Sequence, residues 1–327
     1  MLQAKKFQPK NANLQSAKRE KNDEFYTRFA DIESECAHYQ QHFQGKKVLC
    51  NCDDPRVSNF FRYFFLNFHK LGLMRLVATC LLCPDTNEQA LYCIYDGTAT
   101  DYQWDTLKGD GDFRSVECIE LLKQTDIICT NPPFSLFREY VAQLMEYKKQ
   151  FLIIGNYNAI SYKEIFPLIK DNRMWLGNGF SGGNAYFGVP DNYSNSQIFF
   201  IDGARMCKFR SCCWFTNLDV AKRHRVLPLQ VRYTPERFPK YDNYEAIEVG
   251  KIAEIPKDYD GIMGVPITFL DKYNPNQFEI LGLDDHRLVY PEWRGRGPDL
   301  KGKPVYRRVI IHKKTSEPAI ANDILNL

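Results

Sequence analysis

The chain has 327 residues, 44% hydrophobic and 25% charged, a globular composition that excludes a disordered, collagenous or coiled-coil protein. It has no apolar stretch of ~18 residues, no secretory signal and no disulfide framework among its eleven cysteines, so we expect a cytoplasmic protein with reduced thiols and no membrane partner. The net charge of +3 conceals three basic segments (1–21, 205–240 and 287–314) with 24 Lys and Arg against five acidic residues; they indicate either a polyanion-facing surface or solvated loops.

Strands alternate with helices through the first half of the chain, a pattern typical of an α/β sheet with crossover helices. Lys46–Cys52 is an apolar strand that leads into Asp53-Asp54-Pro55, whose carboxylates and proline predict a helix start. The next helix ends near Gly72 and has its apolar residues at helical spacing, which assigns that face to the core. These residues are Val57, Phe60, Phe61, Phe64, Phe65 and Phe68.

The same alternation continues to residue 172. The predicted elements are a strand at Leu73–Leu82, a hairpin within Leu91–Trp104, a helix at Ser115–Lys123, a strand at Asp126–Thr130, a capped helix at Ser135–Tyr147, a central parallel strand at Phe151–Gly155 and a helix at Tyr162–Asn172. The following strands lack helices between them, which predicts antiparallel pairing: Ala185–Val189, Gln197–Ile201 and Cys212–Phe215. A second, smaller region, rich in Pro, Tyr and basic residues, is expected from about 221.

The string DIICTNPPF, residues 126–134, holds the most informative chemistry. It is a strand that ends in Asn131, Pro132, Pro133 and Phe134, and ligands of open α/β sheets bind beyond the carboxyl ends of strands. Two prolines fix the backbone and remove two N–H donors, so the loop presents carbonyl acceptors beside the side-chain carbonyl of Asn131. The alternative is a turn in which the prolines merely stop a strand.

A planar amino group such as N6 of adenine fits these acceptors, because it offers two N–H donors beside a ring. Hydrogen bonds to the Asn131 side chain and the Pro132 carbonyl would make the nitrogen more tetrahedral and more nucleophilic, while Phe134 would stack on the ring. Positioning and electrostatics would supply the acceleration, and no general base with a tuned pKa is required.

A strand followed by this tetrapeptide resembles the catalytic motif of amino-group methyltransferases that use S-adenosylmethionine. Longer segments, spread over about residues 20–280, resemble the EcoRI-type adenine-specific DNA methyltransferases. These segments are KNDEFYT (21–27), VLCNCDDPRVSNFF (48–61), GDGDFRS (109–115), TNPPFSLFREY (130–140), WFTNLD (214–219), PKYDNYEAI (239–247) and GIMGVPITFL (261–270).

The resemblance implies a Rossmann-like α/β fold, in which a seven-stranded sheet binds S-adenosylmethionine over the carboxyl ends of its first strands, with a C-terminal DNA-recognition region. We expect a basic arm at 1–21, a catalytic domain at 22–220 and a target-recognition region at 221–327. The implied activity is the site-specific transfer of a methyl group from S-adenosylmethionine to N6 of an adenine flipped out of duplex DNA.

The implied cofactor contacts lie in three segments. The loop after the first strand (Asn51, Cys52, Asp53, Asp54) would face the methionine end of the cofactor, Asp112 would lie near its adenine amino group with Phe113 nearby, and the N-terminal side would be covered by Phe25, Tyr26 and Thr27. The usual glycine-rich loop is missing after the first strand, which predicts a different backbone path there. Helix-cap and turn roles are the alternatives for Asp53 and Asp112.

The basic segments downstream of the tetrapeptide are the candidate DNA surface, mostly through phosphate contacts. Candidate residues are Lys222, Arg223, Arg225, Arg294 and Arg296. A second aromatic wall for the flipped base could come from Phe187, Trp214 or Phe215, although each is more often a core residue. Cys80 and Cys83 form half of a zinc pattern without a second half, so no metal site is predicted.

Two alternative functions stay open. A methyltransferase acting on RNA or on a protein glutamine can share the tetrapeptide but usually carries a glycine-rich cofactor loop, whereas a catalytically inactive DNA-binding relative would be expected to have a damaged tetrapeptide. The expected partner is double-stranded DNA, bound by a monomer. A cognate restriction endonuclease in the same system would act without direct contact.

Overall fold

The computed structural model describes residues 26–52, 54, 56–81, 89–180, 183–189, 198–201, 203–284 and 298–314. It divides into two compact units, which are treated separately. Unit 1 comprises Met1–Ala159 and Leu176–Leu218, and unit 2 comprises Ile160–Trp175 and Asp219–Leu327. A segment of the region expected to be catalytic, 160–175, therefore belongs to unit 2.

Unit 1 is built on a large mixed sheet with the strand order β5-β4-β3-β2-β6-β7-β12-β8. Its central described strands are parallel: β3 (Arg75–Thr79), β2 (Lys47–Cys50), β6 (Ile127–Thr130) and β7 (Gln150–Asn156). The antiparallel neighbours on either side are β4 (Leu91–Tyr95), paired with β5 (Trp104–Thr106), and β12 (Cys212–Thr216). β8 (Trp175–Leu176) forms the far edge. The predicted α/β class and the hairpin are confirmed.

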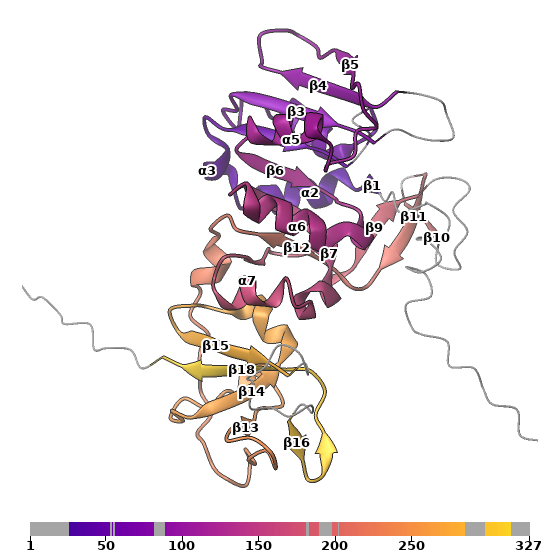
Figure 1. Ribbon diagram of the computed structural model, residues 1–327. Coiled ribbons are helices and arrows are strands. Elements are labelled where there is room, and N and C mark those ends of the chain that lie inside the picture. The colour runs from indigo at the N-terminus through magenta and orange to yellow at the C-terminus, as the bar shows by residue number, and fades with distance from the viewer. Residues whose placement is uncertain are drawn as a thin grey trace, which may run out of the picture. The chain divides into compact units, whose positions relative to one another are not determined.

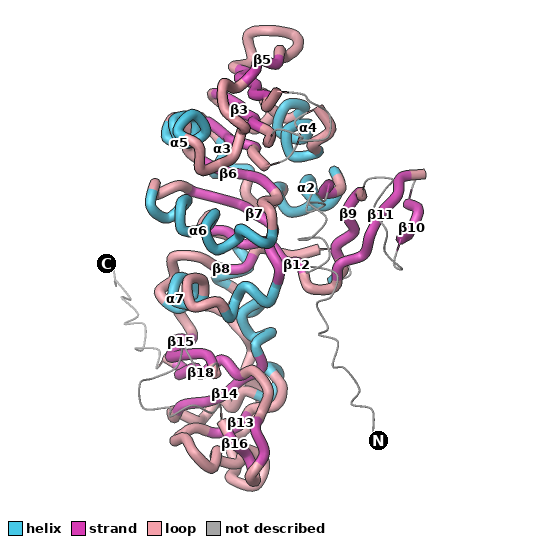
Figure 2. Tube along the Cα trace, turned by 45° about the vertical axis from the view of Figure 1, so that its right-hand side comes forward, coloured by secondary structure: helices cyan, strands magenta, loops and turns pink. Residues whose placement is uncertain are grey.

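Helices cover both faces of this sheet, with α5 and α6 on one face and α2 and α4 on the other (Figures 1 and 2). Adjacent residues of β12 point to opposite faces, so Phe215 packs on Phe137 of α6 at 5.0 Å while Trp214 meets Phe60 of α4 at 5.8 Å. The helices are α2 (Phe29–Cys36), α3 (Gln40–Phe43), α4 (Asn59–Leu66), α5 (Val116–Lys123) and α6 (Phe137–Glu146).

Helix α4 begins later than the sequence predicts. The predicted start at Asp53–Pro55 is wrong, because Ser58 caps the helix by accepting a hydrogen bond from the backbone N–H of Phe61 at 3.4 Å. Val57 precedes the helix and is 55% exposed, so it is not part of the core face. The other predicted core residues are buried or half-buried: Phe60, Phe61, Phe64, Phe65 and Phe68.

Two further helices differ from their predictions. Instead of a capped start at Ser135, the chain makes a 3-10 turn, η1 (Phe134–Leu136), and enters α6 without a side-chain cap. The helix predicted at Tyr162–Asn172 is reduced to α7 (Phe166–Lys170), preceded by the 3-10 turn η2 (Tyr157–Ser161).

A second sheet in unit 1 consists of antiparallel strands in the order β1-β9-β11-β10, of which β9, β11 and β10 lie side by side in Figure 2. They are β1 (Tyr26–Thr27), β9 (Ala185–Gly188), β11 (Ala204–Phe209) and β10 (Ile198–Ile201). The three predicted strands are each antiparallel to a neighbour, but none pairs with another of the three: β9 and β10 both pair with β11, and β12 joins the large sheet. β11 was missed because its sequence, ARMCKF, includes two cations and buries Cys207 alone among its six residues.

Unit 2 contains another sheet, with the order β13-β14-β18-β15. Its strands are β13 (Ile247–Glu248), β14 (Ile262–Pro266), β18 (Arg308–Lys313) and β15 (Phe278–Leu283), and a small hairpin joins β16 (Asp299–Leu300) to β17 (Lys303–Pro304). Unit 2 also has the 3-10 turns η4 (Ala221–His224), before β13, and η5 (Ile252–Glu254) and η6 (Ile267–Lys272), between its strands. These elements are too short to produce the long periodicity that sequence reading needs.

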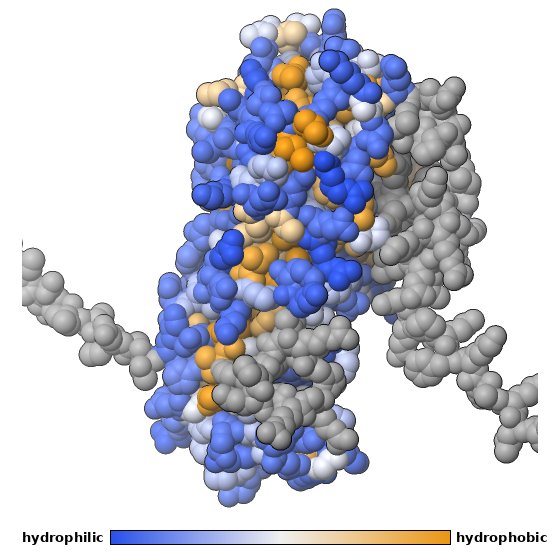
Figure 3. Space-filling view, in the orientation of Figure 1, coloured by the Kyte–Doolittle hydropathy of each residue, from blue (hydrophilic) through white to orange (hydrophobic). Residues whose placement is uncertain are grey.

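Within the described ranges, no helix has both the length and the apolar character needed to cross a membrane. The face shown in Figure 3 is mostly hydrophilic, with apolar residues in small groups.

Candidate active site

The tetrapeptide Asn131–Phe134 lies directly after β6, at the carboxyl edge of the parallel strands. Asn131 is buried, with 6% of its surface exposed. The carbonyl of Pro133 accepts a hydrogen bond from the backbone N–H of Leu136 at 3.0 Å, which turns the chain into η1 and then α6. The predicted position beyond a strand end is therefore the observed one.

The ring of Phe134 lies among other aromatic rings of unit 1. It meets Phe187 of β9 edge-on at 6.5 Å, and Phe187 in turn contacts Phe180 and Phe209. The three residues weighed as a second wall for a flipped base, Phe187, Trp214 and Phe215, are fully buried. Of these rings, Phe187 meets Phe134 of the tetrapeptide edge-on.

The loop after β2 approaches the tetrapeptide through Asn51, which is 5% exposed. The hydroxyl of Thr130 donates to the backbone carbonyl of Asn51, and the hydroxyl of Tyr140 donates to its side-chain Oδ1 at 2.5 Å. Two buried hydrogen bonds thus join the loop predicted to face the cofactor to the residues on either side of the tetrapeptide.

The same loop turns without glycine. Cys52 has a φ of 69°, the left-handed conformation that glycine adopts most readily. A cysteine thus adopts a glycine-like conformation in a loop that lacks the usual glycines. Asp53 lies outside the described residues. Asp54 forms an ion pair with Arg56 at 2.7 Å and accepts a hydrogen bond from its backbone N–H, which is a turn role.

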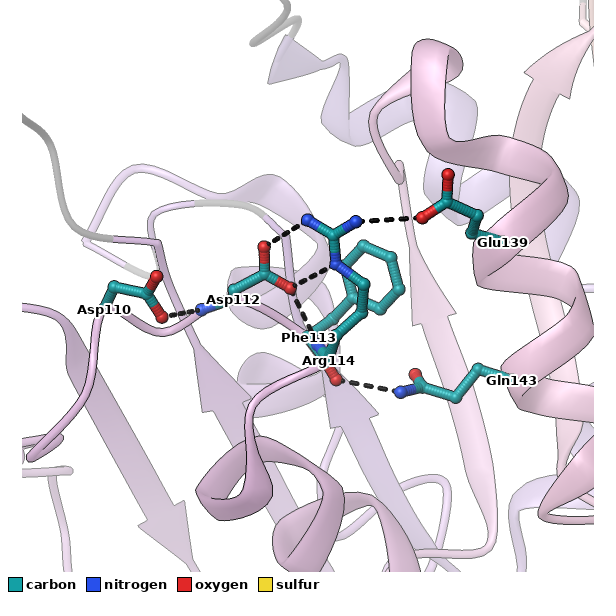
Figure 4. A network of polar contacts seen from close by, with 6 residues as sticks. All are labelled: Asp110, Asp112, Phe113, Arg114, Glu139 and Gln143. Carbon is teal, nitrogen blue, oxygen red and sulfur yellow. Dashed lines mark hydrogen bonds and ion pairs between the residues drawn. The ribbon is translucent and has the colours of Figure 1, made fainter.

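Asp112 and Phe113 lie in a polar network that ends on helix α6 (Figure 4). Arg114 donates three hydrogen bonds to the Asp112 carboxylate, at 2.7–2.9 Å, and a fourth to Glu139 of α6 at 2.9 Å. The side chain of Gln143 donates to the Phe113 carbonyl at 3.0 Å. The hydrogen bonds from Arg114 hold the pKa of Asp112 below its ordinary value, so the carboxylate is ionised at neutral pH.

The N-terminal segment meets the same region. Tyr26 pairs with Gly188 and Thr27 with Phe187, and the Thr27 carbonyl accepts a hydrogen bond from the Asn59 side chain at 2.7 Å. Through Phe187, β1 is therefore one residue away from Phe134. Phe25 lies outside the described residues.

The predicted DNA contacts of unit 2 fall into two groups. Arg225 is exposed, and Lys222 is partly covered, with its Nζ 3.8 Å from Asp271. Arg223, however, is only 8% exposed: its guanidinium stacks 4.0 Å from the Trp175 ring and donates to Asn172 at 2.6 Å. This burial gives Arg223 a packing role, so we carry Lys222 and Arg225 forward as DNA contacts. Arg294 and Arg296 lie outside the described residues.

The chemistry of these segments suits S-adenosylmethionine. A carboxylate offers about four acceptor positions, of which Arg114 takes three at Asp112, so one acceptor can still meet an adenine amino group. Asn51 accepts through Oδ1 and keeps an amide N–H₂ group that can donate to the methionine carboxylate. No cluster of three or more metal-ligating side chains occurs among the described residues, and Cys83 lies outside them.

Thr130, Tyr140 and Arg114 were not predicted as site residues from the sequence. All three stand inside the quoted segments GDGDFRS and TNPPFSLFREY. A tyrosine on the buried face of the helix that follows the tetrapeptide was the available signal, because its hydroxyl must find a partner.

The chain matches a known family and three known proteins along most of its length. The family model described as adenine-specific methyltransferase EcoRI matches residues 13–315. Type II methyltransferase M.EcoRI of Escherichia coli is 46% identical over 326 residues, which cover 93% of this chain and 97% of that protein. Type II methyltransferase M.MpnI of Mycoplasma pneumoniae is 41% identical over 315 residues, with 91% and 97% covered.

A third relative, Type II methyltransferase M.MgeORF184P of Mycoplasma genitalium, is 40% identical over 316 residues, with 91% of this chain and 98% of the relative covered. No solved structure matches the chain. The resemblance inferred from the sequence motifs is confirmed, and the chain belongs to the EcoRI family of adenine-specific methyltransferases.

Proposed function

We propose that this adenine-specific DNA methyltransferase transfers the methyl group of S-adenosylmethionine to N6 of an adenine flipped out of a specific site in duplex DNA. Membership of the family supports adenine as the target base, and the Type II relatives support site-specific methylation. The observation that carries the proposal is the position of Asn131–Phe134 at the carboxyl edge of the sheet, between Thr130 and Tyr140, which both donate hydrogen bonds to Asn51.

The residues of the tetrapeptide have separate roles in this proposal. The Asn131 side-chain carbonyl and the Pro132 carbonyl accept the two N–H groups of the adenine amino group and direct its lone pair out of the ring plane. The Pro133 carbonyl accepts from Leu136, which fixes the turn. Phe134 stacks on the adenine. A fixed arrangement of acceptors needs little reorganisation during the reaction, which is why positioning alone can accelerate it.

S-adenosylmethionine, when bound, supplies an electrophilic methyl group on a sulfonium. In our proposal the loop of Asn51, Cys52 and Asp54 meets its methionine end, the remaining acceptor position of Asp112 meets its adenine amino group, and Phe113 packs beside it. The carboxylate of Asp112 is already ionised, which suits an acceptor. Tyr26 and Thr27 cover the site from the side of β9.

We assign the large sheet to the Rossmann-like methyltransferase fold. Seven strands in the order β4-β3-β2-β6-β7-β12-β8 would form the family sheet, and β5 would be an added partner of β4 at its edge. The cofactor segments then follow β2 and lie near the end of β3, as expected of ligands of open α/β sheets.

We assign DNA recognition to the region after 220, with Lys222 and Arg225 as phosphate contacts. Six Lys and Arg against one acidic residue in 221–240 support this assignment. Extrusion of the target adenine costs a few kcal/mol, which phosphate contacts of this kind would offset. We further propose that the enzyme is cytoplasmic and needs no direct contact with a restriction endonuclease. We also propose that it acts as a monomer, which light scattering would test.

The experiment compares methyl incorporation from labelled S-adenosylmethionine into duplex DNA, RNA and protein by the unaltered chain and by Asn131→Ala and Phe134→Ala. We expect incorporation into DNA alone, lost in Asn131→Ala and strongly reduced in Phe134→Ala. Full activity of Asn131→Ala would end the mechanism, and incorporation into RNA or protein would favour the alternative substrates. No binding of S-adenosylmethionine in calorimetry would favour an inactive DNA-binding relative. Single-molecule sequencing of the modified DNA identifies the base and its context.

A further inference from the structure

Helix α6 follows the catalytic tetrapeptide directly and reaches both segments that we assign to the cofactor. Its residues Glu139, Tyr140 and Gln143 lie at helical spacing on one face. Glu139 contacts Arg114 and Gln143 contacts the Phe113 carbonyl (Figure 4), while Tyr140 packs its ring on Phe113 at 5.0 Å. Helix α6 therefore links the tetrapeptide to both segments that we assign to the cofactor.

Tyr140 has a second contact, which the other two residues lack. Its hydroxyl donates to Asn51 Oδ1 at 2.5 Å, inside unit 1, where Tyr140 has no exposed surface. Burial raises the pKa of this phenol well above its ordinary value, so the hydroxyl stays protonated and serves as a donor.

An amide whose oxygen is held in this way has only one orientation left. The Asn51 nitrogen is bonded to the same carbon as Oδ1, so it points away from Tyr140 and offers its two N–H donors to the other side. The backbone of Asn51 is fixed independently, because its carbonyl accepts from Thr130. Both the position of the residue and the orientation of its amide are thus set by the residues that flank the tetrapeptide.

We propose that Tyr140 is a positioning residue for the methyl donor: it orients the Asn51 amide so that its N–H groups bind the carboxylate of S-adenosylmethionine. This inference rests on the proposed function. It gives the enzyme a direct link between the loop that holds the donor and the loop that holds the acceptor, and transfer requires the two reacting atoms to lie within about 3–3.5 Å of each other.

The test uses Tyr140→Phe, which keeps the ring on Phe113 and removes the hydroxyl. Calorimetry measures the binding of two probes, S-adenosylmethionine and its decarboxylated form, which keeps the sulfonium but lacks the carboxylate. We expect about tenfold weaker binding of S-adenosylmethionine, the loss of one charge-assisted hydrogen bond, and less than about twofold change for the decarboxylated form. Equal weakening of both, or no weakening of either, would overturn the inference.

Tyr39→Phe is the matched control, because Tyr39 is also fully buried and its hydroxyl donates to the Glu35 side chain at 2.9 Å. It should leave the ratio of the two affinities unchanged. A structural role shared by any buried tyrosine would change both variants alike and would contradict the proposal.

A second variant, Asn51→Asp, keeps an oxygen for Tyr140 but replaces the N–H₂ donors by a negative charge. We expect Asn51→Asp to weaken the binding of S-adenosylmethionine at least as much as Tyr140→Phe does, without weakening the binding of the decarboxylated form. If Tyr140→Phe does not fold, Asn51→Asp alone tests the inference. Equal weakening of both probes in Asn51→Asp would also contradict the inference. If the unaltered protein methylates DNA but the variants do not discriminate, the inference fails alone; if it neither binds S-adenosylmethionine nor methylates DNA, the proposed function fails with it.

Discussion

Gly111 passes so close to the end of strand β3 that a Cβ atom at this position would overlap the carbonyl oxygen of Cys80. The Cβ of Ala90 would also lie only 2.9 Å away, and Gly111 has a φ of +77°. The loop that carries Asp112 and Phe113 thus depends on the absence of a side chain one residue earlier.

We therefore expect Gly111→Ala to lower the free energy of unfolding by about 2–4 kcal/mol, from a left-handed residue and an overpacked contact together. Urea unfolding measures this change. Gly109→Ala, two residues earlier, is the control: its nearest atom would be Glu117 Oε2 at 3.9 Å, and we expect a change within about 0.5 kcal/mol. Equal effects of the two substitutions would contradict the close contact.

Cys52 leads to a prediction about backbone conformation rather than packing. Because its φ is 69°, Cys52→Gly removes the steric cost of the left-handed conformation, while Cys52→Val increases it through a β-branched side chain. We expect Cys52→Gly to change the free energy of unfolding by no more than about 1 kcal/mol and Cys52→Val to lower it by about 1–3 kcal/mol. Thermal unfolding of the two variants tests this, and a valine variant as stable as the glycine variant would refute it.

The parts of this fold that the sequence predicted are those with strong local patterns. The strand β6 and the tetrapeptide were predicted because an apolar run ends in two prolines, and a helix was predicted at Ser115–Lys123, where the structure has α5 with Ser115 as its cap. The start of α4 was wrong because Asp53–Pro55 offers the same capping chemistry as Ser58, and the choice between them depends on where the chain leaves β2.

Contacts between distant residues left no such pattern. The residue type of Cys52 does not indicate its left-handed backbone conformation. The hydrogen bond between Tyr140 and Asn51 joins residues 89 positions apart, which no local pattern indicates. Arg223 stood in a basic segment and was predicted to contact DNA with its neighbours, but Trp175 supplies an aromatic face on which its guanidinium packs. In each case tertiary packing decides what a local pattern leaves open.

The Asp112–Arg114 pair leads to a prediction about pH. The pKa of Asp112 is lowered in the folded protein, chiefly by hydrogen bonds from Arg114, so its contribution to stability is present above the unfolded carboxyl pKa of about 3.9 and is lost as the pH falls through the lower folded pKa. Asp112→Asn should therefore cost stability at pH 7, by less than about 1 kcal/mol because the pair is partly exposed, and nothing at the acidic end.

Urea unfolding at several pH values measures the difference between Asp112→Asn and the unaltered chain. In an Arg114→Gln background the difference should be smaller, because the guanidinium donors are gone and only the backbone N–H of residue 114 still donates to Asp112. An undiminished difference in that background would assign the stabilisation to another partner.

Arg223 and Arg225 stand two positions apart, yet the structure separates their expected roles. Arg225 is exposed, so Arg225→Ala should weaken DNA binding about equally for all sequences and reduce the slope of log affinity against log salt by about 1. Arg223→Ala removes a buried cation that stacks on Trp175 and donates to Asn172. It should lower the free energy of unfolding by about 1–3 kcal/mol while leaving the salt slope unchanged. Binding titrations in a series of salt concentrations distinguish the two, and a reduced slope in Arg223→Ala would mean that this guanidinium leaves Trp175 to bind phosphate.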